Sequence, residues 1–172
     1  DTRWQAESGQ YLLALEVEVA DGVLSVIDRR EAAGALAEDW FNRGAILEAL
    51  DAEAAQRAYE EALAADPAHC GAANNLGRLI HADGQLDAAE RVYREALAAC
   101  GTDALLHYNL GVLLEDTGRV DEAVQAYERA LSEDAGLADC HYNLARLYQA
   151  QGRAQEAIRH LARYRRLAGE PD

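Results

Sequence analysis

Lysine and methionine are absent from this chain of 172 residues, and proline, phenylalanine and cysteine are scarce. All 16 basic residues are therefore arginine, against 31 acidic residues, and the formal net charge is -15. A protein this acidic repels phosphate backbones, so the composition argues against nucleic-acid binding by this chain. Because no methionine opens the sequence, we expect an excised domain or a processed product.

Long hydrophobic runs are also lacking. No apolar stretch approaches the roughly 18–20 residues that cross a bilayer, and no basic-then-apolar leader precedes a cleavage site. We therefore predict that the chain has no membrane partner and is cytoplasmic.

The three cysteines, Cys70, Cys100 and Cys140, are widely spaced and odd in number. None has the short spacing of a zinc or redox motif, so we interpret them as small buried apolar residues in a reducing compartment. Two cysteines have a histidine neighbour, His69 or His141, but adjacent helical residues point about 100° apart. We predict no metal and no other cofactor.

A step of 34 residues recurs through most of the chain. The positions that share it are Gly77, Gly111 and Ala145; Gly84, Gly118 and Gly152; Ala89, Ala123 and Ala157; and Tyr93, Tyr127 and Leu161. A fixed period of about 20–50 residues indicates stacked units, none of which can bury its apolar face alone.

Each unit divides at its second glycine into two apolar stripes with helical spacing. In one unit these stripes are Leu110, Leu113 and Leu114, then Val120, Ala123, Val124 and Tyr127. The glycine between them suits the left-handed backbone of a helix end. Each unit is thus predicted to be an antiparallel helix pair, in which Gly77 faces Ala89 near the crossing and Tyr93 fills the space further along.

A less regular copy spans residues 39–67 and has a shorter turn without glycine. It carries the same pattern at Trp40, Gly44, Leu47, Ala55, Tyr59 and Ala62, followed by Pro67. The helix pair, the 34-residue step and the Trp-Leu-Gly-Tyr/Ala-Tyr-Ala-Pro signature resemble the tetratricopeptide repeat family over residues 36–168.

This resemblance implies an all-α fold, a right-handed α-solenoid of about four helix-turn-helix units with eight helices. We expect the units near residues 36–69, 70–103, 104–137 and 138–168, with a tail at 169–172. Tyr164 stands where Ala62, Ala96 and Ala130 stand earlier, which indicates that no further unit packs behind the fourth.

Residues 1–35 follow another pattern. Leu13, Leu15, Val17 and Val19 alternate with less apolar residues, and Asp21-Gly22 is typical of a tight turn before a return strand at 23–27. We predict a short β-hairpin or extended segment, although an amphipathic helix from Tyr11 to Val19 also fits. A lone hairpin is marginal in water, so it must lie against the first helices or pair with a second copy in a homodimer.

The lead-in WQAESGQYLL, residues 4–13, is similar to linkers in bacterial MerR-type regulators that carry such repeats behind a DNA-binding head. This resemblance implies an alternative function. The chain would then be the sensory or oligomerisation domain of a transcription regulator whose DNA-binding head lies upstream.

In tetratricopeptide arrays the first helices line the concave groove. An asparagine occupies one place in all four units: Asn42, Asn75, Asn109 and Asn143. An amide offers both donors and an acceptor, so such a row can hold an extended peptide backbone. The alternative is that each asparagine only bonds the backbone of the neighbouring repeat.

Three aromatic residues accompany the asparagines and can cover apolar side chains of a partner. The predicted peptide-binding residues are Phe41, Asn42, Asn74, Asn75, Arg78, Tyr108, Asn109, Val112, Glu115, Tyr142, Asn143 and Arg146. We predict a scaffold or adaptor that binds a peptide segment or helix of a partner protein in this groove.

Catalytic residues are not predicted. Ser8, Ser25 and Ser132 lack acid–base neighbours in the sequence, and the glycines belong to helix packing and turns rather than to a phosphate-binding loop. Residues 146–167 hold six arginines and one acid, Glu156. These cations either suit the end of a last helix or mark a site for an anionic partner.

Overall fold

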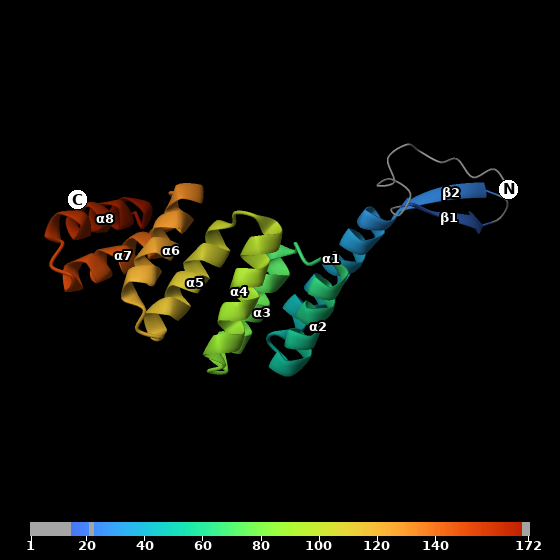
Figure 1. The fold of residues 1–172 in the computed structure, drawn as a ribbon, viewed down its shortest axis with the longest axis horizontal. Coiled ribbons are helices and arrows are strands. Elements are labelled where there is room, and N and C mark those ends of the chain that lie inside the picture. Colours follow the sequence, from blue (N-terminus) through green and yellow to red (C-terminus); the bar gives the residue numbers. More distant parts are fainter. Residues whose placement is uncertain (1–14, 21–22, 170–172) are drawn as a thin grey trace.

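The computed structural model describes residues 15–20 and 23–169, and these form two strands followed by eight helices (Figure 1). The elements are β1 (Leu15–Ala20), β2 (Val23–Asp28), α1 (Arg29–Leu47), α2 (Ala52–Ala65), α3 (Cys70–Ala82), α4 (Leu86–Cys100), α5 (Ala104–Asp116), α6 (Val120–Glu133), α7 (Ala138–Ala150) and α8 (Ala154–Leu167). The lead-in at 4–13, with Ser8 and Tyr11, and the turn dipeptide Asp21-Gly22 lie outside the described residues.

The helices pack as four successive pairs, α1 with α2, α3 with α4, α5 with α6 and α7 with α8. The second helix of each pair also contacts the first helix of the next pair. Figure 1 shows the pairs following one another along the long axis of the molecule. This arrangement confirms the helical solenoid, since each apolar stripe is buried against its own pair and the next one.

Glycine–tyrosine contacts draw the two helices of a pair together. A Cβ atom at Gly111 would lie 2.6 Å from the Tyr127 ring, and Gly44 stands in the same relation to Tyr59. The sequence pattern predicts that an alanine of the second helix faces this glycine. Ala89 and Ala123 are indeed fully buried, but the nearest neighbours of the glycines are the tyrosine rings.

Positive-φ glycines make the turns inside the last three pairs. Gly84, Gly118 and Gly152 have φ values of 76°, 75° and 74°, a region that residues with a Cβ rarely adopt. The first pair turns without glycine. There, Asp51 starts α2 by accepting a hydrogen bond from the Ala54 backbone N–H at 2.9 Å.

The N-terminal segment forms an antiparallel hairpin in which Leu15 pairs with Asp28 and Ala20 with Val23. Strand structure from Leu15 onward replaces the alternative of a helix reaching Val19. Helix α1 begins at Arg29, earlier than the first unit expected from residue 36. Figure 1 places the hairpin beyond the N-terminal end of α1.

The cysteine interpretation requires correction. Cys70 and Cys100 form a disulfide with a Cα–Cα distance of 6.2 Å, and only Cys140 is a buried free thiol. Although 30 residues separate the paired cysteines, the antiparallel packing of α3 and α4 brings the start of one helix to the end of the other. Disulfides persist in oxidising environments, so this pair does not indicate a reducing compartment.

The two ends of the array differ from its interior. One equivalent position of α3, α5 and α7 is apolar and fully buried: Ala72, Leu106 and Cys140. The Cys140 Sγ lies 3.3 Å from the Tyr127 carbonyl of the preceding pair. The equivalent residue of α1 is the exposed Asp39. At the other end, α8 has no buried residue, and the Tyr164 ring packs on Tyr142 at 5.2 Å between centroids.

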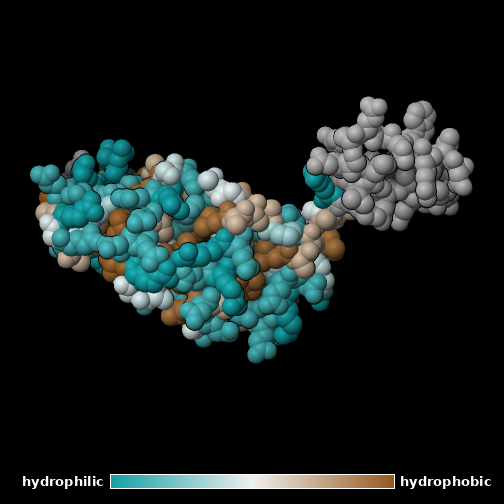
Figure 2. All heavy atoms as spheres, viewed as in Figure 1, coloured by the Kyte–Doolittle hydropathy of each residue, from teal (hydrophilic) through white to brown (hydrophobic). Residues whose placement is uncertain are grey.

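The surface is mostly hydrophilic on the face shown in Figure 2, with hydrophobic residues emerging in separate patches along the helices. None of the helices in the described part of the chain combines the length and apolar character that crossing a membrane requires.

Candidate functional site

The predicted peptide-binding residues lie on the four first helices, α1, α3, α5 and α7. We call them the first-helix row: Phe41, Asn42, Asn74, Asn75, Arg78, Tyr108, Asn109, Val112, Glu115, Tyr142, Asn143 and Arg146. In each helix the asparagine follows directly after another member of the row, and the remaining members come at further steps of about one turn, on the face of the asparagine. Contacts between α3 and α5 bring consecutive parts of the row together.

Hydrogen bonds tie the α3 part of the row to the core. The Asn75 Nδ2 donates to the Tyr59 hydroxyl at 3.0 Å, and that hydroxyl donates to Glu48 at 2.6 Å. Glu48 in turn forms an ion pair with Arg78. A buried tyrosine of the first pair therefore positions two residues of the row in the second pair.

The same network recurs between the third and fourth pairs. The Asn143 Nδ2 donates to the Tyr127 hydroxyl at 3.2 Å, and this hydroxyl donates to Glu115 at 3.4 Å. Glu115 pairs with Arg146. Three members of the row are thus held in place by one fully buried ring.

Protonation states in both networks follow from burial and pairing. Burial, with a smaller contribution from the hydrogen bond to Glu48, raises the pKa of Tyr59 to about 12. Burial first, and the nearby Glu115 charge second, raise the pKa of Tyr127. The hydrogen bond to Glu115 raises the pKa of Arg146. At neutral pH the hydroxyls therefore stay protonated donors and the guanidinium stays charged.

The other two asparagines have different partners. Asn109 donates to the Asn74 side-chain oxygen at 2.5 Å, across the junction between the second and third pairs. Asn42 is exposed and donates to Glu38 of its own helix at 3.3 Å. Asn75, Asn109 and Asn143 all bond side chains of the preceding pair, rather than its backbone.

The aromatic members of the row pack on rings of the second helices. Phe41 lies 5.9 Å from the Tyr59 ring and Tyr108 lies 5.8 Å from the Tyr127 ring, between centroids. Both are partly buried, whereas Tyr142 keeps 47% of its surface exposed. Tyr142 is therefore the aromatic side chain of the row that is most accessible to a partner.

A cavity of about 350 Å³ opens at the C-terminal end of the row. Tyr142, Ala145 and Arg146 line it from α7, and Ile158 and Leu161 line it from α8. The sequence reasoning omitted both α8 residues. The sequence contains a signal for this cavity. Leu161 stands where the buried tyrosines stand in the earlier units, and because leucine is smaller than tyrosine it leaves space between α7 and α8.

In the described part of the chain, no three histidine, cysteine or acidic side chains gather closely enough to hold a metal ion. The Ser132 hydroxyl donates to the Arg129 carbonyl of its own helix at 2.7 Å.

Comparison with models of protein families agrees with the repeated helix pairs of the structure. Models of the tetratricopeptide repeat match residues 70–132 and residues 114–172. No curated protein matches the sequence.

Solved structures with the same fold include MamA, at a TM-score of 0.68 and 19% identity, over 83% of this chain and 85% of that one. PilW, described as a type IV pilus biogenesis factor, has a TM-score of 0.66 and 20% identity, over 84% and 72%. A tetratricopeptide repeat protein from Parabacteroides merdae has a TM-score of 0.67 and 19% identity, over 80% and 56%. At these identities the likeness shows the fold alone.

Proposed function

The chain belongs to the tetratricopeptide repeat family, and on that premise we propose that its first-helix row holds a peptide segment or a helix of a partner protein. The family fold supports a protein-interaction scaffold in general. The specific part of the proposal is that the partner's segment lies on the first-helix row.

One observation carries it: the row is ordered before any partner arrives. The Tyr59 and Tyr127 networks fix asparagine, glutamate and arginine side chains of the row on α3, α5 and α7. Side chains that are already held lose little conformational freedom on binding, so more of the contact energy appears as affinity. Tyrosine and arginine are also the residue types enriched among binding hot spots.

The experiment uses the two most accessible row residues of the fourth pair. Tyr142→Ala with Arg146→Ala removes an exposed ring and a guanidinium without touching the buried Tyr127 hydroxyl. We expect the immobilised variant to lose the partners that the wild type captures from lysate of its source organism, as identified by mass spectrometry. Hot-spot residues cost about 2 kcal/mol or more when truncated, which is about a 30-fold loss of affinity.

Arg57→Ala is the matched control, because Arg57 lies on α2, is 65% exposed and pairs only with its helical neighbour Glu53 among the described residues. Thermal unfolding of all variants checks that each is folded. An unchanged set of captured partners for the folded Tyr142/Arg146 variant would show that the row is architectural and that binding, if any, occurs elsewhere.

A further inference from the structure

Two cavities lie at equivalent places one repeat apart, on residues that the first-helix row does not use. The first, of about 480 Å³, is bounded by α4, α5 and α6, and the second, of about 390 Å³, by α6, α7 and α8. They share three residue types at the 34-residue step: His107 and His141, Glu122 and Glu156, and Arg129 and Arg163.

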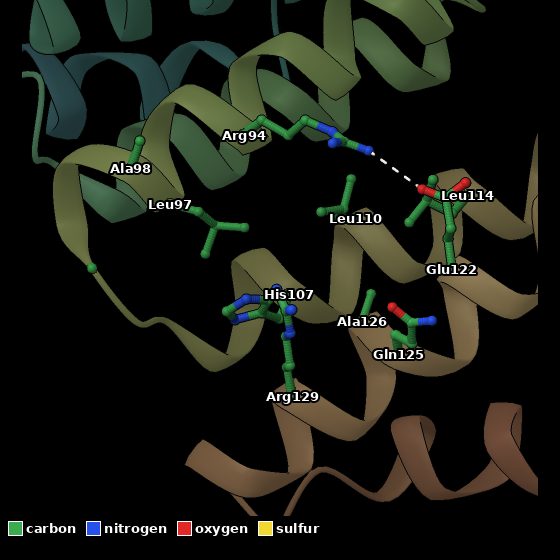
Figure 3. Close-up of a pocket in the computed structure, with 11 residues that line it drawn as sticks. Arg94, Leu97, Ala98, His107, Leu110, Leu114, Glu122, Gln125, Ala126 and Arg129 are labelled. Atoms are coloured by element: carbon green, nitrogen blue, oxygen red, sulfur yellow. Dashed lines mark ion pairs between the residues drawn. The ribbon is translucent and has the colours of Figure 1, made fainter.

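The first cavity is lined by leucines and by two arginines. Figure 3 shows Arg94 and Arg129 reaching in from α4 and α6, with Leu97 and Leu110 between them. Arg94 pairs with Glu122 at 3.7 Å. Among the residues that the structure describes, none forms an ion pair with Arg129.

The base of this cavity is polar as well. His107 is almost buried, and its Nδ1 lies 3.2 Å from Glu133 and 3.2 Å from the Asp103 carbonyl. Both neighbours can accept a hydrogen bond from Nδ1, and the His107 ring lines the cavity.

The second cavity is lined by three arginines and two glutamates, Glu128 and Glu156, so its net charge of +1 equals that of the first cavity. Arg153 is engaged twice, by Glu156 at 3.0 Å and by the Tyr148 ring at 4.1 Å. Arg159 and Arg163 also line this cavity, and within the described ranges neither has an ion-pair partner. Unpaired arginines are notable in a chain whose net charge is -15.

A third cavity at the equivalent place between α2, α3 and α4 lacks this chemistry. It is smaller, at about 180 Å³, and has Ala73 in the histidine position and Glu95 in the arginine position. The histidine and arginine therefore are not demanded by the packing of helix pairs, since the first junction forms without them.

We propose that the two arginine-bearing cavities bind an acidic segment of a partner protein, with successive carboxylates on Arg129 and Arg163. Carboxylate–guanidinium pairs are the strong, often bidentate form of hydrogen bond. The methylene groups of a glutamate would lie beside Leu97 and Leu110 of the first cavity. Two sites in series suit a chain with repeated acidic side chains. The acidic remainder of the protein disfavours an anionic membrane surface.

Fluorescence anisotropy with two labelled peptides tests the proposal. One peptide carries glutamates and leucines separated by glycines, and the other has glutamine in place of every glutamate. We expect the wild type to bind the glutamate peptide at least about tenfold more tightly than the glutamine peptide. Arg129→Gln with Arg163→Gln should remove this preference, and added salt should weaken it because the cavities are open to solvent.

Arg57→Gln is the control for a general loss of charge, and it should bind like the wild type. The Tyr142→Ala, Arg146→Ala variant should also retain the glutamate peptide, which separates this surface from the first-helix row. Equal affinity for the two peptides overturns the proposal, as does a preference that survives in the folded Arg129/Arg163 variant. Binding to phosphatidylserine vesicles that the same variant abolishes, without peptide binding, would identify a membrane surface instead.

Discussion

At the scale of single residues, the close packing of the helix pairs depends on glycines, which have no side chain. Gly111 has no Cβ, and the Tyr127 ring occupies the space that a Cβ would take. That ring is fully buried, and its hydroxyl reaches Glu115 and Asn143 in the first-helix row. One glycine–tyrosine contact therefore serves both the closeness of the helices and the order of the candidate site.

Gly111→Ala should destabilise the protein by about 1–3 kcal/mol, because the new methyl group overpacks the Tyr127 ring at about 2.6 Å. Urea denaturation measures the change. Gly34→Ala is the control, since it lies within α1 with no atom within 4 Å of the added Cβ. Alanine is the better helix former there and should leave stability unchanged or raise it by up to about 1 kcal/mol. Equal losses for both variants would contradict the role of the ring contact.

At the scale of elements, the second helix pair has a covalent link that the others lack among the described residues. The disulfide from Cys70 to Cys100 joins the beginning of α3 to the end of α4. Spacing along the sequence did not reveal it, because 30 residues look distant until the chain folds back into two antiparallel helices. The pair also lies beside the Ala68 carbonyl in the connection from α2, at the junction with the first pair.

Reduction with dithiothreitol should therefore lower the free energy of unfolding. For a closed loop of this length the chain-entropy estimate is about 3.5 kcal/mol. Urea denaturation with and without the reductant measures the loss, and the Cys70→Ser, Cys100→Ser double variant should show no further effect of the reductant. Three free thiols in a titration of the unfolded, unreduced protein would show that the link is not formed.

At the scale of the whole molecule, the ends of the array determine what it can associate with. The exposed Asp39 stands where α3, α5 and α7 have a buried apolar residue, so a further helix pair that covered this position of α1 would bury a carboxylate. Beyond α1 lies the hairpin of β1 and β2, whose two strands pair with each other. A two-stranded hairpin leaves unpaired edges that a second copy can extend.

The hairpin leads us to expect that residues 1–172 form a dimer. Size-exclusion chromatography with light scattering should give twice the monomer mass for residues 1–172, and the monomer mass for a chain starting at Ala32, which lacks both strands. Circular dichroism of the shorter chain checks that the helices remain. Identical monomer masses for the two chains would contradict self-association through the hairpin.

Much of this architecture follows from the sequence alone. A 34-residue step in glycine, alanine and tyrosine predicts stacked helix pairs because each pair must bury the same apolar stripe in the same way. The turn glycines and the hairpin follow from local backbone preferences, which depend on a few adjacent residues. The row of asparagines was also visible, since equivalent residues of a repeat must occupy equivalent places.

Only the tertiary structure decided which of these residues meet. The bond from Asn143 to Tyr127, the Cys70–Cys100 link and the place of Arg129 in its cavity all depend on distances between helices that are remote in the sequence. Periodicity shows which positions are equivalent, but not what each side chain touches across the junction. The repeat therefore establishes the scaffold, and the packing of neighbouring pairs determines where a partner can bind.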